Sequence, residues 1–502
     1  MRKSLIALTV ALAAAARPIE TKPLPVCFCL LSLGWFASDD VSVLNDGCAV
    51  AVVDAGDRLA PEALYEVARS TAADAAVEAL YTDEDQAGEA GERQAPRFKP
   101  AWSPDLLLDG PYVGRLAFLR VDLMRALEGF REGIDGSEEW DLWLRASRRR
   151  LAVRRIPLVL YHRHHRHAAP AQPPASAARV LADRCAESGT AVDVQCSSSG
   201  HWRVSWQPPR QPLVSIIVPN RNAAAIMRQC ATGVLDQTAY PSRELIIVDN
   251  GSTEAATLQL YAELTGAGRA RVVPFDRPFN FSAACNAGAA AARGELLLFL
   301  NNDIEVIEPG WLDDLVGWGM RPEIGVVGAQ LLYPDRTIQH AGVVVGLGLV
   351  GHLFARAEPD AAGLFGSPAS YRDCLAVTGA CQLMRREVFA QLGGFDERFR
   401  ISFSDVVLCL AAWTAGYRVV YTPYARLIHH ESYTRERDDA PQDKKLLATY
   451  LRANGFEDDP YFHPELNPRS TVPDLRPAYE PTAGAAVREV IERTLAANMG
   501  AR

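Results

Sequence analysis

The chain has 502 residues, of which 48% are apolar and 23% charged, a composition typical of a globular protein with two or three domains. Its formal net charge of −9 leaves no basic surplus to neutralise phosphates, which argues against a nucleic-acid-binding protein. The ten cysteines form no CxxC pair, so we expect reduced thiols rather than a disulfide framework or a zinc site.

The first 38 residues are expected to stand apart from the fold. They begin MRKSLIALTVALAAAARPIE, with a basic start, an apolar stretch and small residues before Arg17. This pattern fits a secretory signal, a helix lying on a membrane surface, or a start that is not native to the gene. The apolar stretch is short for a transmembrane helix. Export would favour a different function, that of an exported carbohydrate-binding protein.

A regular pattern begins at residue 213, after a Pro-rich and Ala-rich stretch that predicts a linker region over 168–212. We expect strands at 213–218, 244–248, 271–274 and 295–300, and helices at 223–237 and 283–292, with Asn222 capping the first helix. Almost wholly apolar strands alternating with helices predict a parallel sheet covered on both faces. Ligands of such sheets bind beyond the carboxyl ends of the strands.

Polar residues follow two of these strands. Asp249 opens the turn DNGS, where it either closes an Asx-type turn or accepts a hydrogen bond from a nucleotide. The run LLLFLNNDIEVI ends a strand at Asn301, Asn302 and Asp303. These residues form either a polar loop or a site for a divalent cation and a diphosphate, since Mg²⁺ and Mn²⁺ prefer oxygen ligands.

Downstream segments offer further candidates. Asp405, before an apolar helical stretch, fits a helix cap and also a general base. His429 is either half of a surface His pair or a ligand of the same cation as Asp303. GLGLVG at 346–351 matches GxGxxG without a βαβ context, so we expect a glycine-rich loop over the site. HRHHRH at 162–167 predicts a solvated basic turn.

The chain also repeats itself weakly. VVDAGDRLAPEAL (52–64) parallels FLNNDIEVIEPGWL (299–312), GSEEWDLWL (136–144) parallels SFSDVVLCL (402–410), and LVLYHRHH (158–165) parallels ARLIHHES (425–432). Three matches in the same order predict that residues 39–167 are a partial copy of the later domain.

The text over about 213–435 resembles the family 2 glycosyltransferases of the GT-A fold. The resemblance is carried by VSIIVPNRN, ELIIVDNGS, NFSAACNAGAAAARGELLLFLNND, VTGACQLMRREVFAQLGGFDERF, SDVVLCL and YRVVYTPYARLIHHES. It implies an α/β fold with a Rossmann-like, mostly parallel sheet and helices on both faces. Together with the repeat, it implies a tandem bacterial type with a truncated, degenerate first domain, and we expect a helical and irregular extension at 436–502.

The resemblance further implies an inverting, metal-dependent transfer of a single sugar from a nucleotide-sugar donor to a glycan or lipid-linked acceptor in cell-surface polysaccharide biosynthesis. Mg²⁺ or Mn²⁺ would be the cofactor, and a hexosyl- or rhamnosyltransferase is expected, in the cytoplasm or peripheral at the inner face of the membrane. The implied base is Asp405, and the implied metal ligands are Asp303 and His429. The implied donor-binding residues are Pro219, Arg221, Asp249, Asn280, Asn286 and Asn302.

The sequence departs from the family at several positions. Asparagines stand where many relatives have aspartates, and Val407 replaces an acidic residue that usually follows the base. In the first half only Asp54 and Asp57 remain of the acidic positions, and Glu139 stands where the base would be. An alternative function is therefore a catalytically impaired, sugar-nucleotide-binding or scaffold protein of a glycan assembly complex.

Overall fold

The structure is a computed structural model that describes residues 28–32, 48–89, 91–164, 174–186, 190–431 and 440–496. Residues 1–27 and 33–38 of the predicted N-terminal segment, and 165–167 of the predicted basic turn, lie outside the described residues. The described parts of both predictions are wrong: Phe28–Ser32 form a strand that pairs with Ala49–Val53, and 162–164 are the end of the strand Val153–His164. The chain divides into two compact units. Unit 1 covers residues up to 189 with 194–202 and 364–366, and unit 2 covers the rest.

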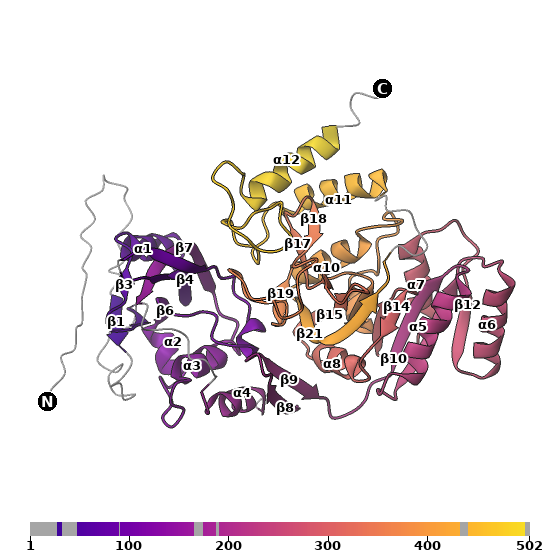
Figure 1. The fold of residues 1–502 in the computed structure, drawn as a ribbon, viewed down its shortest axis with the longest axis horizontal. Helices are drawn as coiled ribbons and strands as arrows, with labels where there is room; N and C mark the ends of the chain where they lie inside the picture. The colour runs from indigo at the N-terminus through magenta and orange to yellow at the C-terminus, as the bar shows by residue number, and fades with distance from the viewer. Residues whose placement is uncertain are drawn as a thin grey trace. The chain divides into compact units, whose positions relative to one another are not determined.

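Unit 1 contains a mixed sheet with strand order β1-β2-β6-β4-β7-β3, and β5 pairs with β4 (Figure 1). Its strands are β1 (Phe28–Ser32), β2 (Ala49–Val53), β3 (Arg58–Leu59), β4 (Ala79–Ala87), β5 (Arg93–Arg97), β6 (Ala117–Arg120) and β7 (Val153–His164). Its helices are α1 (Ala63–Ala73), α2 (Val121–Ala126), α3 (Glu138–Ala146) and α4 (Ala177–Ala186), with a short 3-10 helix at Leu106–Leu108. One face of the sheet packs on α1 through a cluster that includes Val67, Leu80 and Phe118.

Unit 2 is built on a larger mixed sheet with strand order β12-β11-β10-β13-β20-β15-β21-β14, in which β16 pairs with β15 and β19 with β21. Its strands are β10 (Val214–Asn220), β11 (Arg243–Asp249), β12 (Ala270–Pro274), β13 (Leu296–Leu300), β14 (Ile304–Val306), β15 (Ile324–Leu332), β16 (Ile338–His340), β19 (Arg372–Cys374), β20 (Cys381–Arg385) and β21 (Arg418–His429). The ribbon β17 (Val343–Val345) and β18 (Val350–His352) stands apart from this sheet.

The helices of unit 2 are α5 (Ala224–Asp236), α6 (Ala255–Gly266), α7 (Phe281–Ala291), α8 (Trp311–Gly319), α9 (Arg386–Gln391), α10 (Ser404–Thr414), α11 (Pro441–Ala453) and α12 (Ala483–Ala496). They cover both faces of the sheet. On one face Gln382 of β20 bonds to Cys409 of α10, and on the other Leu383 lies against Gly319 of α8. Because successive strand residues point to opposite faces, α8 and α10 lie on opposite sides.

The α/β class is confirmed, and so are the predicted strands and helices between 213 and 300 to within about two residues. The sheet is mixed rather than mostly parallel. β12, β11, β10 and β13 are parallel as predicted, whereas β20 runs antiparallel to both its neighbours. A strand whose residues are all buried, such as β20, does not reveal its direction in the sequence, because both of its faces are buried whichever way it runs.

The two sheets share one strand succession. The order β1-β2-β6-β4-β7-β3 in unit 1 corresponds to β10-β13-β20-β15-β21-β14 in unit 2. The first pair and the fourth pair are parallel in both sheets, and the other three pairs are antiparallel in both. The helices follow the same pattern, since α3 precedes β7 as α10 precedes β21.

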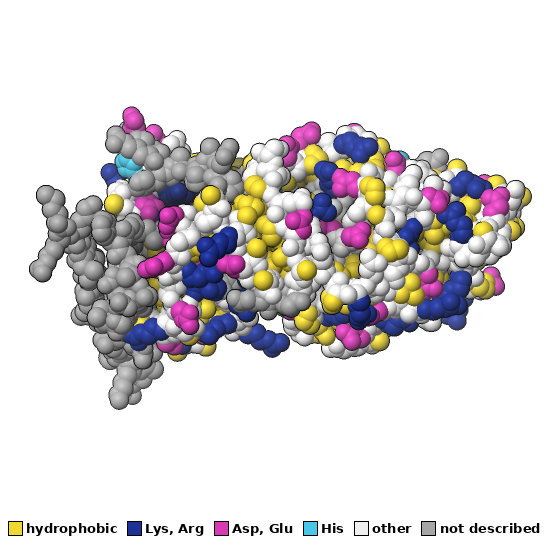
Figure 2. Space-filling model, turned by 90° about the horizontal axis from the view of Figure 1, so that it is seen from below, with side chains coloured by type: hydrophobic (Ala, Val, Ile, Leu, Met, Phe, Trp, Pro, Cys, Tyr) yellow, Lys and Arg dark blue, Asp and Glu magenta, His cyan; other side chains and the backbone are white. Residues whose placement is uncertain are grey.

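The region predicted as a linker contains ordered elements. Besides α4 it holds β8 (Ala191–Cys196) and β9 (Trp202–Gln207), which pair as a two-stranded ribbon. On the face drawn in Figure 2, basic and acidic side chains are intermingled with apolar ones. None of the helices in the described ranges has the length and apolar character that a membrane crossing requires.

Candidate active site

A pocket of about 680 Å³ opens at the carboxyl ends of β10 and β13 in unit 2. This size suits a small-molecule or cofactor site. Its wall is formed by the ends of β10 and β13, the start of α10 and the strand β18. Of the residues predicted from sequence, those that line it are Pro219, Arg221, Asn302, Asp303, Asp405 and His429.

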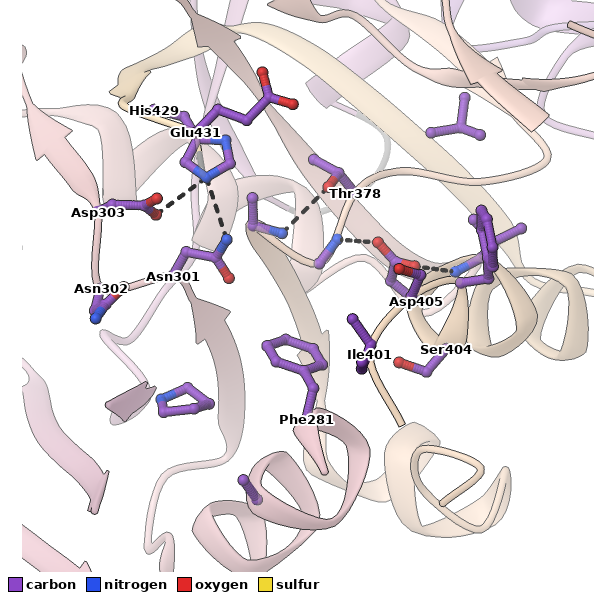
Figure 3. A pocket seen from close by; sticks show the side chains of 18 of the residues that line it. Phe281, Asn301, Asn302, Asp303, Thr378, Ile401, Ser404, Asp405, His429 and Glu431 are labelled. Carbon is purple, nitrogen blue, oxygen red and sulfur yellow. Dashed lines mark hydrogen bonds and ion pairs between the residues drawn. The ribbon is translucent and has the colours of Figure 1, made fainter. Parts of the chain in front are cut away.

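The strand-end loop after β13 delivers Asp303 to one side of this pocket (Figure 3). The five residues of β13 are fully buried, so the chain leaves the core only at Asn301. The Asp303 carboxylate is 7% exposed, and its Oδ1 lies 3.1 Å from Nε2 of His429. Asn301 Nδ2 lies 3.2 Å from the same imidazole nitrogen. The structure thus brings together the two residues predicted as metal ligands.

The His429 ring is oriented by Gln339, which sequence reasoning did not single out. Gln339 Nε2 donates to the Glu431 carboxylate at 3.3 Å, and its Oε1 lies 2.7 Å from His429 Nδ1. A carboxylate only accepts, so the amide oxygen must face His429, and Nδ1 must carry a proton. In the neutral ring, Nε2 then carries the lone pair and faces Asp303. A histidine that binds a metal through Nε2 has this same tautomer.

These residues fit a divalent cation whose shell is completed by other molecules. In the described part of the chain no group of three or more His, Cys, Asp or Glu side chains gathers at one point. The protein ligands of such a cation would be one oxygen of Asp303 and one nitrogen of His429, which lie 3.1 Å apart. Two neighbouring ligands at about 2.1 Å from one ion are separated by about 3 Å, so the spacing is suitable. Mg²⁺ and Mn²⁺ keep waters or take phosphate oxygens where protein ligands are few.

Asp405 faces the pocket from the opposite side, in the first turn of α10 (Figure 3). Its Oδ2 accepts a hydrogen bond from the backbone N–H of Gly379 at 2.6 Å, and its Oδ1 accepts from Val406 N at 2.9 Å. These two bonds fix the orientation of the carboxylate. Asp405 is not the cap of α10, because Phe403 holds that position and no side chain caps it. Its carboxylate accepts from one helix N–H group, that of Val406, and lines the cavity.

A side chain at Gly379 would crowd Asp405, since a Cβ atom there would lie 3.0 Å from Asp405 Cβ and 3.3 Å from its Oδ2. Gly379→Ala is expected to displace Asp405 and reduce turnover about 10- to 100-fold, because small misplacements of a reacting group are costly. Nucleotide binding should change little. Steady-state kinetics would check this, with Gly310→Ala as the control, since a Cβ at Gly310 meets nothing within 4 Å. Unchanged turnover in Gly379→Ala would contradict the expected position of Asp405.

A hydrogen-bonded chain connects the ends of three strands behind the pocket. Asn302 Nδ2 donates to Asn220 Oδ1 at 2.6 Å, and Asn220 Nδ2 contacts the Tyr261 hydroxyl at 2.6 Å. That hydroxyl donates to Asp249 at 3.2 Å, and Asp249 also accepts from the Ser252 backbone and hydroxyl. Asp249 closes its own turn, as one interpretation proposed, and it is not among the pocket-lining residues.

Two other predicted donor-binding residues lie on α7 and hold the segment 394–397 in place. Asn280 caps α7 by accepting from Ala283 N, and its Nδ2 donates to the Glu397 carbonyl at 2.8 Å. Asn286 pairs with the Phe395 backbone through both its amide atoms. Neither side chain lines the pocket. Their role toward a donor therefore stays a prediction.

Other expectations changed in detail. Asn222 does not cap α5, which begins after Ala223. Its Oδ1 accepts instead from the backbone of Thr253 and Glu254, because a left-handed backbone (φ 54°) turns it toward that loop. The GLGLVG stretch is the turn and second strand of the β17–β18 ribbon, and Val350, Gly351 and His352 line the pocket. Burial lowers the pKa of His352.

With this geometry in place, sequence comparison identifies the class. Residues 215–393 match the sequence model of Glycosyl transferase family 2. The chain thus contains a domain that belongs to glycosyltransferase family 2, and the recognition made from its motifs is confirmed.

Relatives extend beyond this domain. The chain is 41% identical over 467 residues to "O-antigen biosynthesis protein RfbC" of Myxococcus xanthus, a match that covers 90% of this chain and 36% of the relative. It is 27% identical over 220 residues to an N-acetylglucosaminyl-diphospho-decaprenol L-rhamnosyltransferase of Mycobacterium tuberculosis, covering 39% of this chain and 69% of that protein. The chain spans little more than a third of the length of the first relative.

Among solved structures, the chain is similar to the mannosyltransferase PcManGT from Pyrobaculum calidifontis in complex with GDP-Man and Mn²⁺. The two are 18% identical with a TM-score of 0.39, over 64% of this chain and 81% of the other.

Proposed function

We propose that unit 2 transfers a single sugar, with inversion, from a nucleotide-sugar donor to a glycan or lipid-linked acceptor in cell-surface polysaccharide biosynthesis. The observation that carries the proposal is the pocket itself. It has a buried Asp303–His429 pair on one side and the fixed carboxylate of Asp405 on the other. The family match and the 41% identity to an O-antigen biosynthesis protein support it.

In this proposal the two sides of the pocket have separate roles. Asp405 accepts the proton of the acceptor hydroxyl as that oxygen attacks the anomeric carbon, because a hydroxyl is a poor nucleophile until a base takes its proton. Asp303 and His429 are the residues that would hold a cation at the donor phosphates. A bound Mg²⁺ or Mn²⁺ would stabilise the negative charge that develops on the leaving diphosphate. Attack from the side opposite the leaving group inverts the anomeric centre.

Other residues of the pocket face the donor in this proposal. Pro219, Arg221 and Asn302 line the donor side, where the guanidinium of Arg221 can pair with phosphate. Asp249 and its hydrogen-bonded chain keep the three strand ends in register. The absence of a QxxRW motif favours addition of one sugar rather than processive polymerisation. We further propose a cytoplasmic location, peripheral at the inner membrane face where lipid-linked acceptors lie.

A donor panel tests this function. UDP-, dTDP- and GDP-sugars would be added with and without Mn²⁺, and the melting temperature followed, because a ligand that binds only the native state raises it. We expect one nucleotide class to stabilise the protein, and to do so more strongly with Mn²⁺. No stabilisation by any donor would overturn the proposal.

A second candidate is a sugar-nucleotide-binding or scaffold protein without turnover. It is favoured by Val407, which stands where relatives carry an acidic residue and is 6% exposed in α10. Saturable donor binding without release of nucleoside diphosphate from any donor and acceptor would favour this candidate over the transferase.

We also propose that unit 1 is a degenerate copy of the same fold that does not transfer sugar. The shared strand succession supports this. So does the state of its acidic residues. Asp57 precedes β3 as Asp303 precedes β14, and it accepts from the Tyr161 hydroxyl at 2.6 Å and His164 N at 2.7 Å. Both acceptor oxygens are thus already engaged by protein groups.

The guanidinium of Arg115 lies between the two acidic residues of unit 1 that correspond to the metal-side and base positions of unit 2. Glu139 is the second residue of α3 as Asp405 is of α10, and Asp54 follows β2 as Asn301 follows β13. Arg115 pairs with both acids of unit 1, with Asp54 at 2.8 Å and more closely with Glu139. A built-in cation neutralises the two carboxylates, so Glu139 is a poor base and a divalent ion is not required.

Glu139→Gln is therefore expected to leave transfer unchanged, in contrast to the same change at Asp405. The assay is turnover per folded molecule, with the folded fraction measured by thermal unfolding, because removing one partner of Arg115 costs stability in unit 1. A loss of turnover that exceeds the loss of folded protein would show that unit 1 contributes to catalysis.

A further inference from the structure

The C-terminal segment 440–496 reaches back to the pocket, although it lies beyond residues 215–393 that match the family model. It does so through two buried carboxylates, Asp443 in the first turn of α11 and Asp459 in the loop after it. Their exposed fractions are 1% and 5%. Carboxylates are rarely buried so completely without partners that need them.

Asp443 holds the loop that leads into α10. A single oxygen, Oδ2, accepts from the backbone N–H groups of Ile401 at 2.8 Å and Ser402 at 2.9 Å. Both residues line the pocket, and Asp405 follows within four positions. Two N–H groups that converge on one carboxylate oxygen fix the direction of the backbone there, because charge-assisted hydrogen bonds are short and strong.

The loop needs such an anchor. Phe403 has a left-handed backbone (φ 68°), which is unfavourable for a residue with a large side chain. Phe403 lines the pocket and directly precedes α10. On the other side, the Arg400 carbonyl accepts from Phe281 N at 2.7 Å. The loop is thus held between α7 and α11, and its position determines that of Asp405.

Asp459 holds the glycine-rich ribbon in the same way. Its Oδ2 accepts from Val345 N at 2.9 Å, at the end of β17. The following Gly346 has φ 115°, and a Cβ there would lie 3.0 Å from Cβ of Ala483 in α12. The partner strand β18 lines the pocket with His352.

We infer that the C-terminal segment is part of the transfer machinery, with Asp443 and Asp459 as positioning residues that set the acceptor side of the pocket. Asp443 positions Asp405 through residues 401–403. Asp459 positions the β17–β18 ribbon, which lines the same pocket. The inference rests on the proposed function, since it takes the side that carries Asp405 as the acceptor side.

The test compares Asp443→Ala with Asp443→Asn in the full chain. Asparagine can present its amide oxygen to both N–H groups, whereas alanine presents none. We expect Asp443→Ala to reduce turnover about 10- to 100-fold. Stabilisation by the nucleotide sugar with Mn²⁺ should stay as in the wild type. Asp443→Asn should retain most of the activity. Gln442→Ala, an exposed neighbour in α11, is the matched control.

Hydrogen exchange of residues 399–406 provides a second readout, which should rise in Asp443→Ala and not in Asp443→Asn. Should Asp443→Ala fail to fold, Asp443→Ser is judged by the same two measurements. Turnover and exchange equal to the wild type in the folded variant, or equal loss in the Asn variant, would overturn the inference. A wild type that transfers no sugar would instead overturn the proposed function.

Discussion

Asp405→Asn is expected to abolish nearly all sugar transfer, with turnover reduced about 100- to 10,000-fold, the range over which a positioned general base contributes. The amide cannot take the proton of the acceptor hydroxyl. The substitution is almost isosteric, and the amide oxygen can still accept from Gly379 N–H. Donor binding should therefore stay near the wild-type level, since the opposite side of the pocket is untouched. The measurement is turnover together with the donor-induced shift in melting temperature.

Asp335→Asn is the matched control for this variant, because Asp335 is an exposed carboxylate in a turn and does not line the pocket. It should transfer at the wild-type rate. Turnover retained by Asp405→Asn would remove Asp405 from the reaction. Loss of donor binding in the same variant would mean that the carboxylate contributes to the donor site instead.

His429→Ala and Asp303→Ala are each expected to remove the part of donor stabilisation that depends on Mn²⁺. Each variant would leave the cation with one protein ligand. The negative charge on the leaving diphosphate would then be stabilised less. A loss of several kcal/mol in the transition state corresponds to at least about 100-fold in turnover. Thermal shift with nucleoside diphosphate, with and without Mn²⁺, separates binding of the cation from catalysis.

The adjacent His430 supplies the control for this pair. Its Nε2 lies 2.9 Å from Glu305 and it does not line the pocket, so His430→Ala should keep the full response to Mn²⁺. A response to Mn²⁺ that persists in both Asp303→Ala and His429→Ala would place the cation elsewhere or exclude it from donor binding.

The fold of residues 213–303 was largely predictable, because its strands can be recognised from short stretches of sequence. The strands β10, β11 and β13 are short apolar runs that end at polar residues, and the helices α5 and α7 were predicted to within about two residues. The helix α6, between β11 and β12, was not predicted. Parallel strands of one sheet end at one edge, so the strand-end residue Asp303 was expected beside a ligand. The run LLLFLNND carries this information without reference to the rest of the chain.

The supporting residues of the site were not predictable. Gln339 comes from β16, a strand of three residues, and His352 from a ribbon that follows a glycine-rich turn. Segments this short have no periodicity to detect. Asp443 meets the loop at 401–402 from a helix about 40 residues further along the chain, and only the tertiary fold shows that contact.

The acidic remnants of the first half were visible in the sequence, but their state was not. Asp54, Asp57 and Glu139 indicated a weakened site. That Arg115 lies between two of them follows only from the packing of β6 beside β2. The sequence predicted a degenerate copy, and the Arg115 pairs with Asp54 and Glu139 support the proposal that unit 1 does not transfer sugar.

The most direct test of the central claim is release of nucleoside diphosphate in the presence of an acceptor, measured for the wild type with Mn²⁺, the wild type with EDTA, and Asp405→Asn with Mn²⁺. With the nucleotide sugar that stabilises the protein, we predict rapid release in the first case and at most a trace in the other two. Equal release in all three would contradict a metal-dependent transfer in which Asp405 is the base, and so would no release in any of them.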